Sequence, residues 1–312
     1  MHVHVGRFAP SPTGELHLGN LRTALIAWLS ARSQSLGFVV RLEDLDRITS
    51  SVEHETAQLS ALAAIGLDWD GDVVRQSERF VLYDAAIERL ITLGRTYECF
   101  CTRREIRDAS SAPHGVAAPE GAYPGTCRSL SAHERAVMVA QGRRPALRLD
   151  AGDRPEVVEI IDEVRGRYVG AVDDVVLRRN DGVPAYNLAV VVDDAHQSVA
   201  EVVRGDDLLS STPRQVLLQR LLGLPTLRYR HVPLVLGADG VRLAKRHGSV
   251  TLAQLAEIGV QPPEVMSLLA TSLGLARVDE RVRAHDLIDR FRLSALPTEP
   301  WVLPANLQRS AS

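Results

Sequence analysis

The beginning of the chain constrains the fold most strongly, because a short apolar strand runs directly into a loop and then a helix. Val3–Arg7 has the composition of a strand, and the loop that follows, Phe8–Gly14, is marked by prolines and a glycine. Apolar residues at three- and four-residue spacing predict a helix over 17–32, and Phe38–Leu42 predicts a second strand. This succession is typical of the start of a parallel nucleotide-binding sheet, so we expect an α/β fold.

Helices and strands continue to alternate after this opening. Ser50 followed by Glu53 is a capping-box signature for a helix that ends at Gly66, and another helix is predicted over 77–93 with Gly94 as its cap. Further strands are predicted at 146–149, 157–161, 175–178, 186–192, 201–204 and 231–236, and further helices at 213–222, 251–258 and 263–274.

Residues 99–130 interrupt this alternation, because they are rich in Gly, Pro, Ser and Ala and contain all three cysteines. The sequence therefore predicts four parts. Residues 1–98 are the first half of an α/β domain, 99–180 are an inserted subdomain, 181–248 are the second half of the domain with a basic loop, and 249–312 are a short helical C-terminal region.

The composition fits a globular protein and excludes several classes. Of the 312 residues, 45% are apolar and 24% charged, with a net charge of −3, whereas disorder requires low hydrophobicity and high net charge. No stretch reaches the ~18 uncharged apolar residues of a membrane helix. The N-terminus lacks a basic segment followed by an apolar run, so we expect no secretory signal and a cytoplasmic location. Three cysteines are too few for a disulfide scaffold.

The loop and helix start Pro10–Asn20 (PSPTGELHLGN) form the first motif with chemical meaning. A helix N-terminus presents unpaired N–H groups and the positive end of the helix dipole, which together bind anions. Gly19 lets a nucleotide approach the backbone closely, and His17 can donate to phosphate oxygens. Taken alone, these residues more often form an ordinary turn with a capping histidine. The motif is neither the GxGxxG of dinucleotide-binding proteins nor a P-loop, which disfavours both classes.

The second motif is the basic loop Val241–Gly248 (VRLAKRHG), which follows a predicted strand. It contains Lys245, the single lysine among the 36 Lys and Arg residues. Such a loop can close on a triphosphate, where Lys245 and Arg246 would neutralise the charge that builds up on a pyrophosphate leaving group. A basic loop alone is usually a solvated surface, so this motif gains meaning only together with the first.

Together the two motifs resemble the HIGH and KMSKS signatures of class I aminoacyl-tRNA synthetases, in the forms His17–Asn20 (HLGN) and Arg242–Arg246 (RLAKR). Asn20 replaces the final histidine of the first signature, and the second lacks its serine and its first lysine. Segments between residues 3 and 275 also resemble the glutamyl-specific branch of this family. They are RFAPSPTG at 7–14, RLED at 41–44, YNLAVVVDD at 186–194, VRGDD at 203–207 and TPRQ at 212–215.

The resemblance implies a Rossmann-like parallel sheet with an inserted zinc-binding or acceptor-type subdomain. It also implies that His17 and Lys245 are catalytic. The implied ATP-binding residues are His17, Gly19, Asn20, Lys245 and Arg246, with Mg²⁺ on the nucleotide. The implied glutamate-binding residues are Arg7, Ala9, Ser11, Glu43, Tyr186 and Arg204. This set suits glutamate, because arginines bind carboxylates through paired donors and a carboxylate binds the ammonium group.

The three cysteines indicate a structural zinc site, because clustered thiolates in a loop-rich segment are typical zinc ligands. They are Cys99, Cys101 and Cys127. Zinc requires a fourth ligand, and His114 and His133 are the nearest histidines. The resemblance favours the phenolate of Tyr123 instead. Buried thiols without a metal are the alternative.

Gly248 is followed only by the residues up to Ser312, whereas glutamyl-tRNA synthetases carry a large helical anticodon-binding region after this loop. This plan resembles truncated paralogs in the family, which activate glutamate without tRNA and transfer it to queuosine at the wobble position of tRNA(Asp). We therefore expect no anticodon-binding domain and a monomer. The expected partners are L-glutamate, ATP and the anticodon loop of tRNA(Asp).

Three alternatives remain open from the sequence. The chain could be the catalytic core of a discriminating glutamyl-tRNA synthetase, or a small-molecule nucleotidyltransferase with a similar HxGH-type site. It could also be a catalytically silent RNA-binding paralog. The retained His17 and Lys245 argue against the silent paralog.

Overall fold

A seven-stranded sheet forms the centre of the computed structural model, which describes residues 4–102, 104–106, 123–152, 156–241, 243 and 250–307. The strand order is β3 (Val74–Arg75), β2 (Gly37–Leu42), β1 (Val5–Phe8), β9 (Val199–Gly205), β10 (Arg228–Val232), β6 (Glu156–Asp162) and β7 (Gly166–Val172). All neighbours are parallel except β6 and β7, which form an antiparallel hairpin at one edge. The expected α/β fold with a mostly parallel sheet is confirmed.

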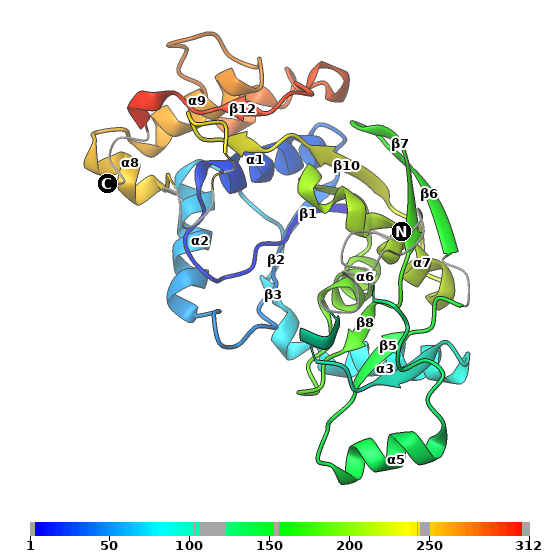
Figure 1. Ribbon diagram of the computed structural model, residues 1–312. Coiled ribbons are helices and arrows are strands. Elements are labelled where there is room, and N and C mark those ends of the chain that lie inside the picture. Colours follow the sequence, from blue (N-terminus) through cyan, green and yellow to red (C-terminus); the bar gives the residue numbers. More distant parts are fainter. Residues whose placement is uncertain are drawn as a thin grey trace.

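Helices pack on both faces of this sheet (Figure 1). One hydrophobic cluster includes α1 (Leu18–Arg32), α2 (Val52–Ala64), α8 (Leu252–Glu257) and α9 (Pro262–Ser272), and the other includes α3 (Phe80–Thr92), α6 (Tyr186–His196) and α7 (Thr212–Leu222). Strand side chains alternate between the clusters: Phe38 and Val40 lie in the first, whereas Val39 packs against the second. Short 3-10 helices are η1 (Gln76–Glu78), η2 (Asp206–Ser211), η3 (Ala284–Leu287), η4 (Leu293–Ala295) and η5 (Ala305–Leu307).

A second, antiparallel sheet lies beside the first. It consists of β4 (Thr96–Cys99), β5 (Ala146–Leu149) and β8 (Val176–Arg178). Figure 1 shows α5 (Ala132–Ala140) beyond this sheet, away from the large one. The range 99–180 thus contributes strands to both sheets, because β6 and β7 extend the large sheet. A two-stranded sheet joins β11 (Val235–Leu236) to β12 (Trp301–Val302) in the C-terminal region.

The segment predicted as a strand at 186–192 is the helix α6, so that prediction is wrong. Its run of apolar, β-branched residues resembles a buried strand because α6 packs against α3 and α7 and buries most of its length. The last turn of α6 carries Asp193 and Asp194, and both carboxylates are buried.

Two other predictions differ in detail. The predicted strand 231–236 divides at Pro233 into β10 of the large sheet and β11 of the two-stranded sheet, since proline lacks the N–H of a continuous strand. The helix predicted to begin at Ser50 is capped by Ser51 instead, whose hydroxyl accepts from the His54 N–H at 3.2 Å.

α1 is enclosed on both of its long sides. It contacts β1, β2 and β9 of the sheet and also α9 and η3 of the C-terminal region. Its Trp28 is fully buried and donates from Nε1 to Asp68 Oδ1 at 2.7 Å. Among the described residues, no helix is both long and apolar enough to cross a bilayer.

Substitution of Leu25 in α1 tests this central position. Leu25→Ala should lower the free energy of unfolding by about 2–5 kcal/mol, because it removes fully buried methyl groups and leaves a cavity. Chemical denaturation followed by circular dichroism measures the change. Leu93→Ala, at a half-exposed position, should change it by less than about 0.5 kcal/mol, and equal losses in the two variants would contradict the packing described.

Candidate active site

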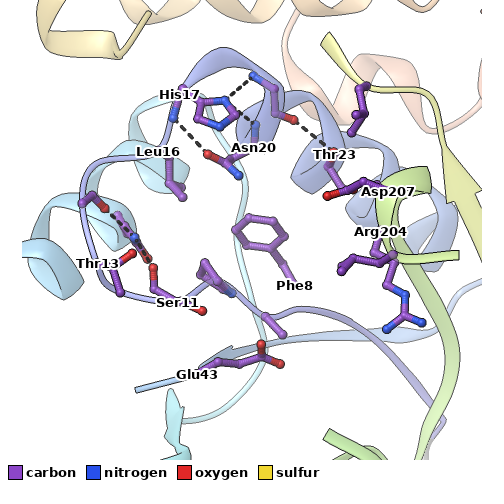
Figure 2. A pocket seen from close by; sticks show the side chains of 18 of the residues that line it. Phe8, Ser11, Thr13, Leu16, His17, Asn20, Thr23, Glu43, Arg204 and Asp207 are labelled. Atoms are coloured by element: carbon purple, nitrogen blue, oxygen red, sulfur yellow. Dashed lines mark hydrogen bonds between the residues drawn. The ribbon is translucent and has the colours of Figure 1, made fainter. Parts of the chain in front are cut away.

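A cavity of about 560 Å³ lies at the carboxyl ends of β1 and β9. The sheet extends from β1 through β2 in one direction and through β9 in the other, so this is the switch point at which α/β sheets bind ligands. Figure 2 shows the side chains that surround it, from the loop after β1, the start of α1 and β9. The cavity is lined by nine of the predicted site residues, which are Arg7, Ala9, Ser11, His17, Gly19, Asn20, Glu43, Tyr186 and Arg204. The predicted Lys245 and Arg246 lie outside the described residues.

His17 is the N-cap of α1. Its Nδ1 accepts hydrogen bonds from the backbone N–H groups of Gly19 at 3.1 Å and Asn20 at 3.3 Å. Because Nδ1 is the acceptor, the neutral imidazole carries its proton on Nε2. The cavity therefore has an Nε2–H donor next to the positive end of the helix dipole, an arrangement that suits a phosphate oxygen.

Gly19 and Asn20 keep this histidine in place. A Cβ at Gly19 would lie 2.9 Å from Cε1 of His17, so a side chain there would displace the imidazole. The Asn20 Oδ1 accepts from the His17 backbone N–H at 3.2 Å and completes a reciprocal cap. Asn20 thus replaces the final histidine of the HIGH signature with a residue that supports the first one.

The floor of the cavity rests on a buried group of charges, of which Arg7 and Glu43 line the cavity itself. Arg41 is fully buried and donates from one terminal nitrogen to Asp194 Oδ1 at 2.8 Å and to Gln197 Oε1 at 2.9 Å. Nε of Arg7 lies 3.6 Å from the same Asp194 oxygen, and another Arg7 nitrogen donates to the Val203 carbonyl at 3.0 Å. Burial lowers the pKa of Arg41, but Asp194 and the other carboxylates raise it by more, so the guanidinium stays charged.

Asp193 anchors the neighbouring side of α6. Its carboxylate accepts from Nε of Arg79 at 2.6 Å, from the Tyr83 hydroxyl at 2.7 Å and from the Gln76 amide at 2.9 Å. Nε of Arg41 lies 3.8 Å away. These contacts tie α6 to α3, η1 and β2, and they fix the end of the helix that supports the cavity.

Arg204 differs from Arg7 and Arg41 in its partners. Its Nε donates to His231 Nε2 at 3.0 Å, and its terminal nitrogens donate to Gln215 Oε1 at 2.9 Å and to Thr212 Oγ1 at 2.8 Å. All three acceptors belong to neutral groups, and no carboxylate among the described residues pairs with Arg204. A buried cation of this kind at a cavity wall is suited to an anionic ligand.

Glu43 follows β2 and lies 3.5 Å from Arg41. Burial raises the pKa of Glu43 to about 7, although Arg41 and Arg7 act in the opposite direction. Tyr186 begins α6 and lines the same cavity, and burial together with Glu43 raises the pKa of its phenol. Tyr186 is therefore a neutral donor beside an ionisable carboxyl group.

Gln58 of α2 holds the loop that follows β1. Its side-chain amide donates to the Ser11 carbonyl at 3.0 Å and to the Gly14 carbonyl at 2.6 Å. The side chain is buried and also lines the cavity. The Pro-containing loop thus has a defined shape, which places Ser11 opposite the start of α1.

The three cysteines meet at the end of β4 and in the segment that follows this strand. Their sulfur atoms lie within 4.8 Å of one another. The Tyr123 hydroxyl lies 3.3 Å from Sγ of both Cys99 and Cys101, and it accepts from the Cys127 N–H at 3.0 Å. No described histidine joins this cluster, and of the two histidines considered, His133 lies in the first turn of α5 while His114 lies outside the described residues.

Comparison with known proteins decides the family. The family model described as the catalytic domain of class I tRNA synthetases (E and Q) matches residues 2–306. The chain belongs to this family.

The relatives of this class I synthetase chain fall into two kinds. It is 59% identical over 301 residues to a protein of Nocardia farcinica named glutamyl-Q tRNA(Asp) synthetase, with 96% of this chain and 93% of the relative covered. It is 40% identical to a glutamate–tRNA ligase of Geobacter sulfurreducens, with 93% of this chain but 61% of the relative covered. The crystal structure of a glutamate tRNA ligase from Elizabethkingia meningosepticum in complex with its amino acid superposes with a TM-score of 0.82. The identity is 27%, over 99% of this chain and 68% of that one.

Sequence reasoning missed the residues that support the arginines and the loop of this synthetase site. They are Arg41, Asp193, Asp194 and His231 for the arginines and Gln58 for the loop. Arg41 and the two aspartates stand in segments that resembled the family, but the prediction of a strand at 186–192 gave the aspartates no place under the cavity. Gln58 and His231 carry no sequence signal, because their partners are distant in the chain.

The elevated pKa of Glu43 is directly measurable. In carboxyl-detected NMR, Glu43 should titrate with a midpoint near pH 7, because burial and Asp194 disfavour its charged form by more than Arg41 and Arg7 favour it. Glu43→Gln assigns the resonance. Glu53, exposed in the first turn of α2 with a lowered pKa, is the matched control, and similar midpoints for the two residues would contradict the burial of Glu43.

Proposed function

We propose that this chain activates L-glutamate with ATP, without tRNA, and transfers the glutamate to queuosine at the wobble position of tRNA(Asp). The observation that carries the proposal is a switch-point cavity with a capped helix N-terminus at one side and Arg204 at the other, where no carboxylate of the described residues pairs with Arg204. The choice of acceptor follows the Nocardia farcinica relative, whose length is matched almost fully.

The charges of the cavity complement those of glutamate. Arg7 and Arg41 are compensated by Asp194, so their role is to shape the floor. Arg204 retains its charge for the side-chain carboxylate of glutamate, and the ionised form of Glu43 binds the α-ammonium group. The α-carboxylate then remains for reaction with ATP. Ala9, Ser11 and Tyr186 complete the pocket around the amino acid.

In the first step an oxygen of the α-carboxylate attacks the α-phosphorus of ATP in line, and pyrophosphate leaves. His17 Nε2–H and the N-terminus of α1 stabilise the negative charge on the α-phosphoryl oxygens. Gly19 and Asn20 hold His17 for this task. Lys245 and Arg246, outside the described residues, neutralise the departing pyrophosphate, and Mg²⁺ bound to the nucleotide would shield the same charge.

In the second step a hydroxyl of the queuosine cyclopentenediol attacks the carbonyl of glutamyl-AMP. The bond to the phosphate breaks, AMP leaves and an ester forms. The proposal also has the enzyme acting as a monomer in the cytoplasm, where ATP and tRNA are found.

The acceptor is tested with labelled glutamate, ATP and tRNA(Asp), with or without queuosine. Label should enter only queuosine-containing tRNA(Asp), and it should still enter tRNA(Asp) that lacks its 3′-terminal adenosine. Wild-type tRNA(Glu) is the comparison. Label on tRNA(Glu) that disappears with the 3′-terminal adenosine would support a glutamate–tRNA ligase like the Geobacter sulfurreducens relative. Formation of no glutamyl-AMP at all would overturn the proposal.

We further propose that Cys99, Cys101, Cys127 and Tyr123 hold one structural zinc ion. Three sulfur atoms within 4.8 Å of one another and a phenol oxygen in hydrogen-bonding contact with two of them supply four donors of the type zinc prefers. Zinc bound there would fasten β4 to the segment around Tyr123 and Cys127 and so stiffen the small sheet.

Metal analysis of the purified protein should therefore find about one zinc ion per chain. Cys127→Ser should weaken zinc binding by roughly a hundredfold or more, and Tyr123→Phe should weaken it by about tenfold or more, in competition with a chromogenic chelator. His133→Ala is the control and should retain zinc. Unchanged binding in Tyr123→Phe would exclude the phenolate as a ligand.

A further inference from the structure

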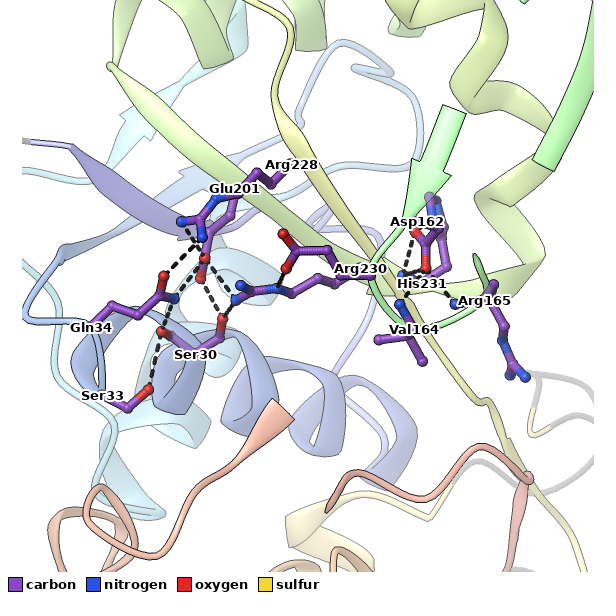
Figure 3. Close-up of polar contacts among 11 residues, drawn as sticks. Ser30, Ser33, Gln34, Asp162, Val164, Arg165, Glu201, Arg228, Arg230 and His231 are labelled. Carbon is purple, nitrogen blue, oxygen red and sulfur yellow. Dashed lines mark hydrogen bonds and ion pairs between the residues drawn. The ribbon is translucent and has the colours of Figure 1, made fainter. Parts of the chain in front are cut away.

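A buried chain of side chains runs from Asp162 through His231 to Arg204 (Figure 3 shows the first two). We propose that His231 and Asp162 are positioning residues that orient Arg204 for the side-chain carboxylate of glutamate and thereby set the preference for glutamate over glutamine. The inference rests on the proposed function, because it assigns Arg204 to that carboxylate.

The hydrogen bonds determine where His231 carries its proton. Asp162 Oδ1 accepts from the N–H groups of Val164 at 3.0 Å and Arg165 at 2.8 Å, while Oδ2 lies 2.6 Å from His231 Nδ1. An ionised carboxylate only accepts, so Nδ1 is the protonated nitrogen. Nε2 is then an acceptor, which is what the Arg204 Nε–H at 3.0 Å requires. Burial lowers the pKa of His231 against the effect of Asp162, consistent with a neutral ring.

The neutral ring orients Arg204 without compensating its charge. Of the five N–H groups of Arg204, one is bound by His231, one by Gln215 and one by Thr212, so two have no hydrogen-bond acceptor among the described residues and suit a ligand. A carboxylate in place of His231 would compete with the ligand, as Asp194 does at Arg7. Glutamine offers an amide to the same two N–H groups and leaves the charge of Arg204 buried and unpaired, which disfavours it.

Asp162→Asn tests this arrangement because it changes the proton pattern but not the size of the side chain. The Asn oxygen keeps the Val164 and Arg165 contacts, so its NH2 faces His231 Nδ1. Nδ1 must then accept, and the ring carries its proton on Nε2, where it opposes the Arg204 Nε–H. We expect the glutamate-to-glutamine ratio of kcat/KM in ATP–pyrophosphate exchange to fall roughly tenfold or more, while the KM for ATP stays within about twofold.

Long-range ¹H–¹⁵N NMR of the histidine rings shows which ring nitrogen of His231 carries the proton. This tautomer would not change if Asp162 only stabilised the fold. His231 should show Nδ1–H in the wild type and Nε2–H in Asp162→Asn. Asp174→Asn is the matched control, since Asp174 is an equally buried carboxylate that binds Tyr97 and Arg128 beside the small sheet. It should leave the glutamate-to-glutamine ratio unchanged.

If Asp162→Asn does not fold, the variants His231→Gln and His231→Leu test the inference instead. Gln keeps an acceptor for Arg204 and should retain more of the preference for glutamate than Leu. Equal ratios in this pair, or a switched tautomer with an unchanged ratio in Asp162→Asn, would overturn the inference. A wild-type protein that performs no exchange with glutamate would instead overturn the proposed function.

Discussion

The floor of the cavity depends on the ion pairs of Asp194, because two buried arginines from adjacent strands approach the same oxygen of its carboxylate. Arg7 comes from β1 and Arg41 from β2, so without a shared anion their like charges would repel one another in a medium that screens little. Asp194 can occupy this place only because α6 is a helix that ends beneath these strands. Asp193, one residue earlier, ties the same helix end to Arg79 and Tyr83.

Within the described parts of the chain, Arg204 lacks the charge compensation that Arg7 and Arg41 have. The floor arginines are matched by carboxylates, whereas Arg204 is held only by neutral acceptors among the described residues. Among the described residues that line the cavity, the buried positive charge without a carboxylate partner therefore lies at one wall. A ligand that brings one side-chain carboxylate and one ammonium group, the latter facing Glu43, satisfies the wall and the floor together.

The sequence predicts those features of the fold and the site that depend on residues close together in the chain. The strand, loop and helix that place His17 lie within a short segment, and the helix cap depends on neighbours such as Asn20. The cysteines were predictable from their spacing and type, and the structure brings them together with Tyr123. The helix α6 was not predictable by periodicity, because burial on several sides removes the polar face that distinguishes a helix from a buried strand. Partners such as Asp162 and His231, 69 residues apart, meet only in the folded sheet.

The two ends of the cavity consequently present hydrogen-bond donors in different ways. At the start of α1 the donors are backbone N–H groups and one histidine whose orientation is set by its own cap. Asn20 stands there in place of a histidine and keeps this arrangement by accepting from the His17 N–H. At Arg204 the donors belong to one side chain, and its orientation depends on residues from β6, β10 and α7. Under the proposed function, a single change among those supporting residues would alter which amino acid fits without touching the phosphate end. Selectivity for the amino acid and catalysis on ATP could then change separately in this fold.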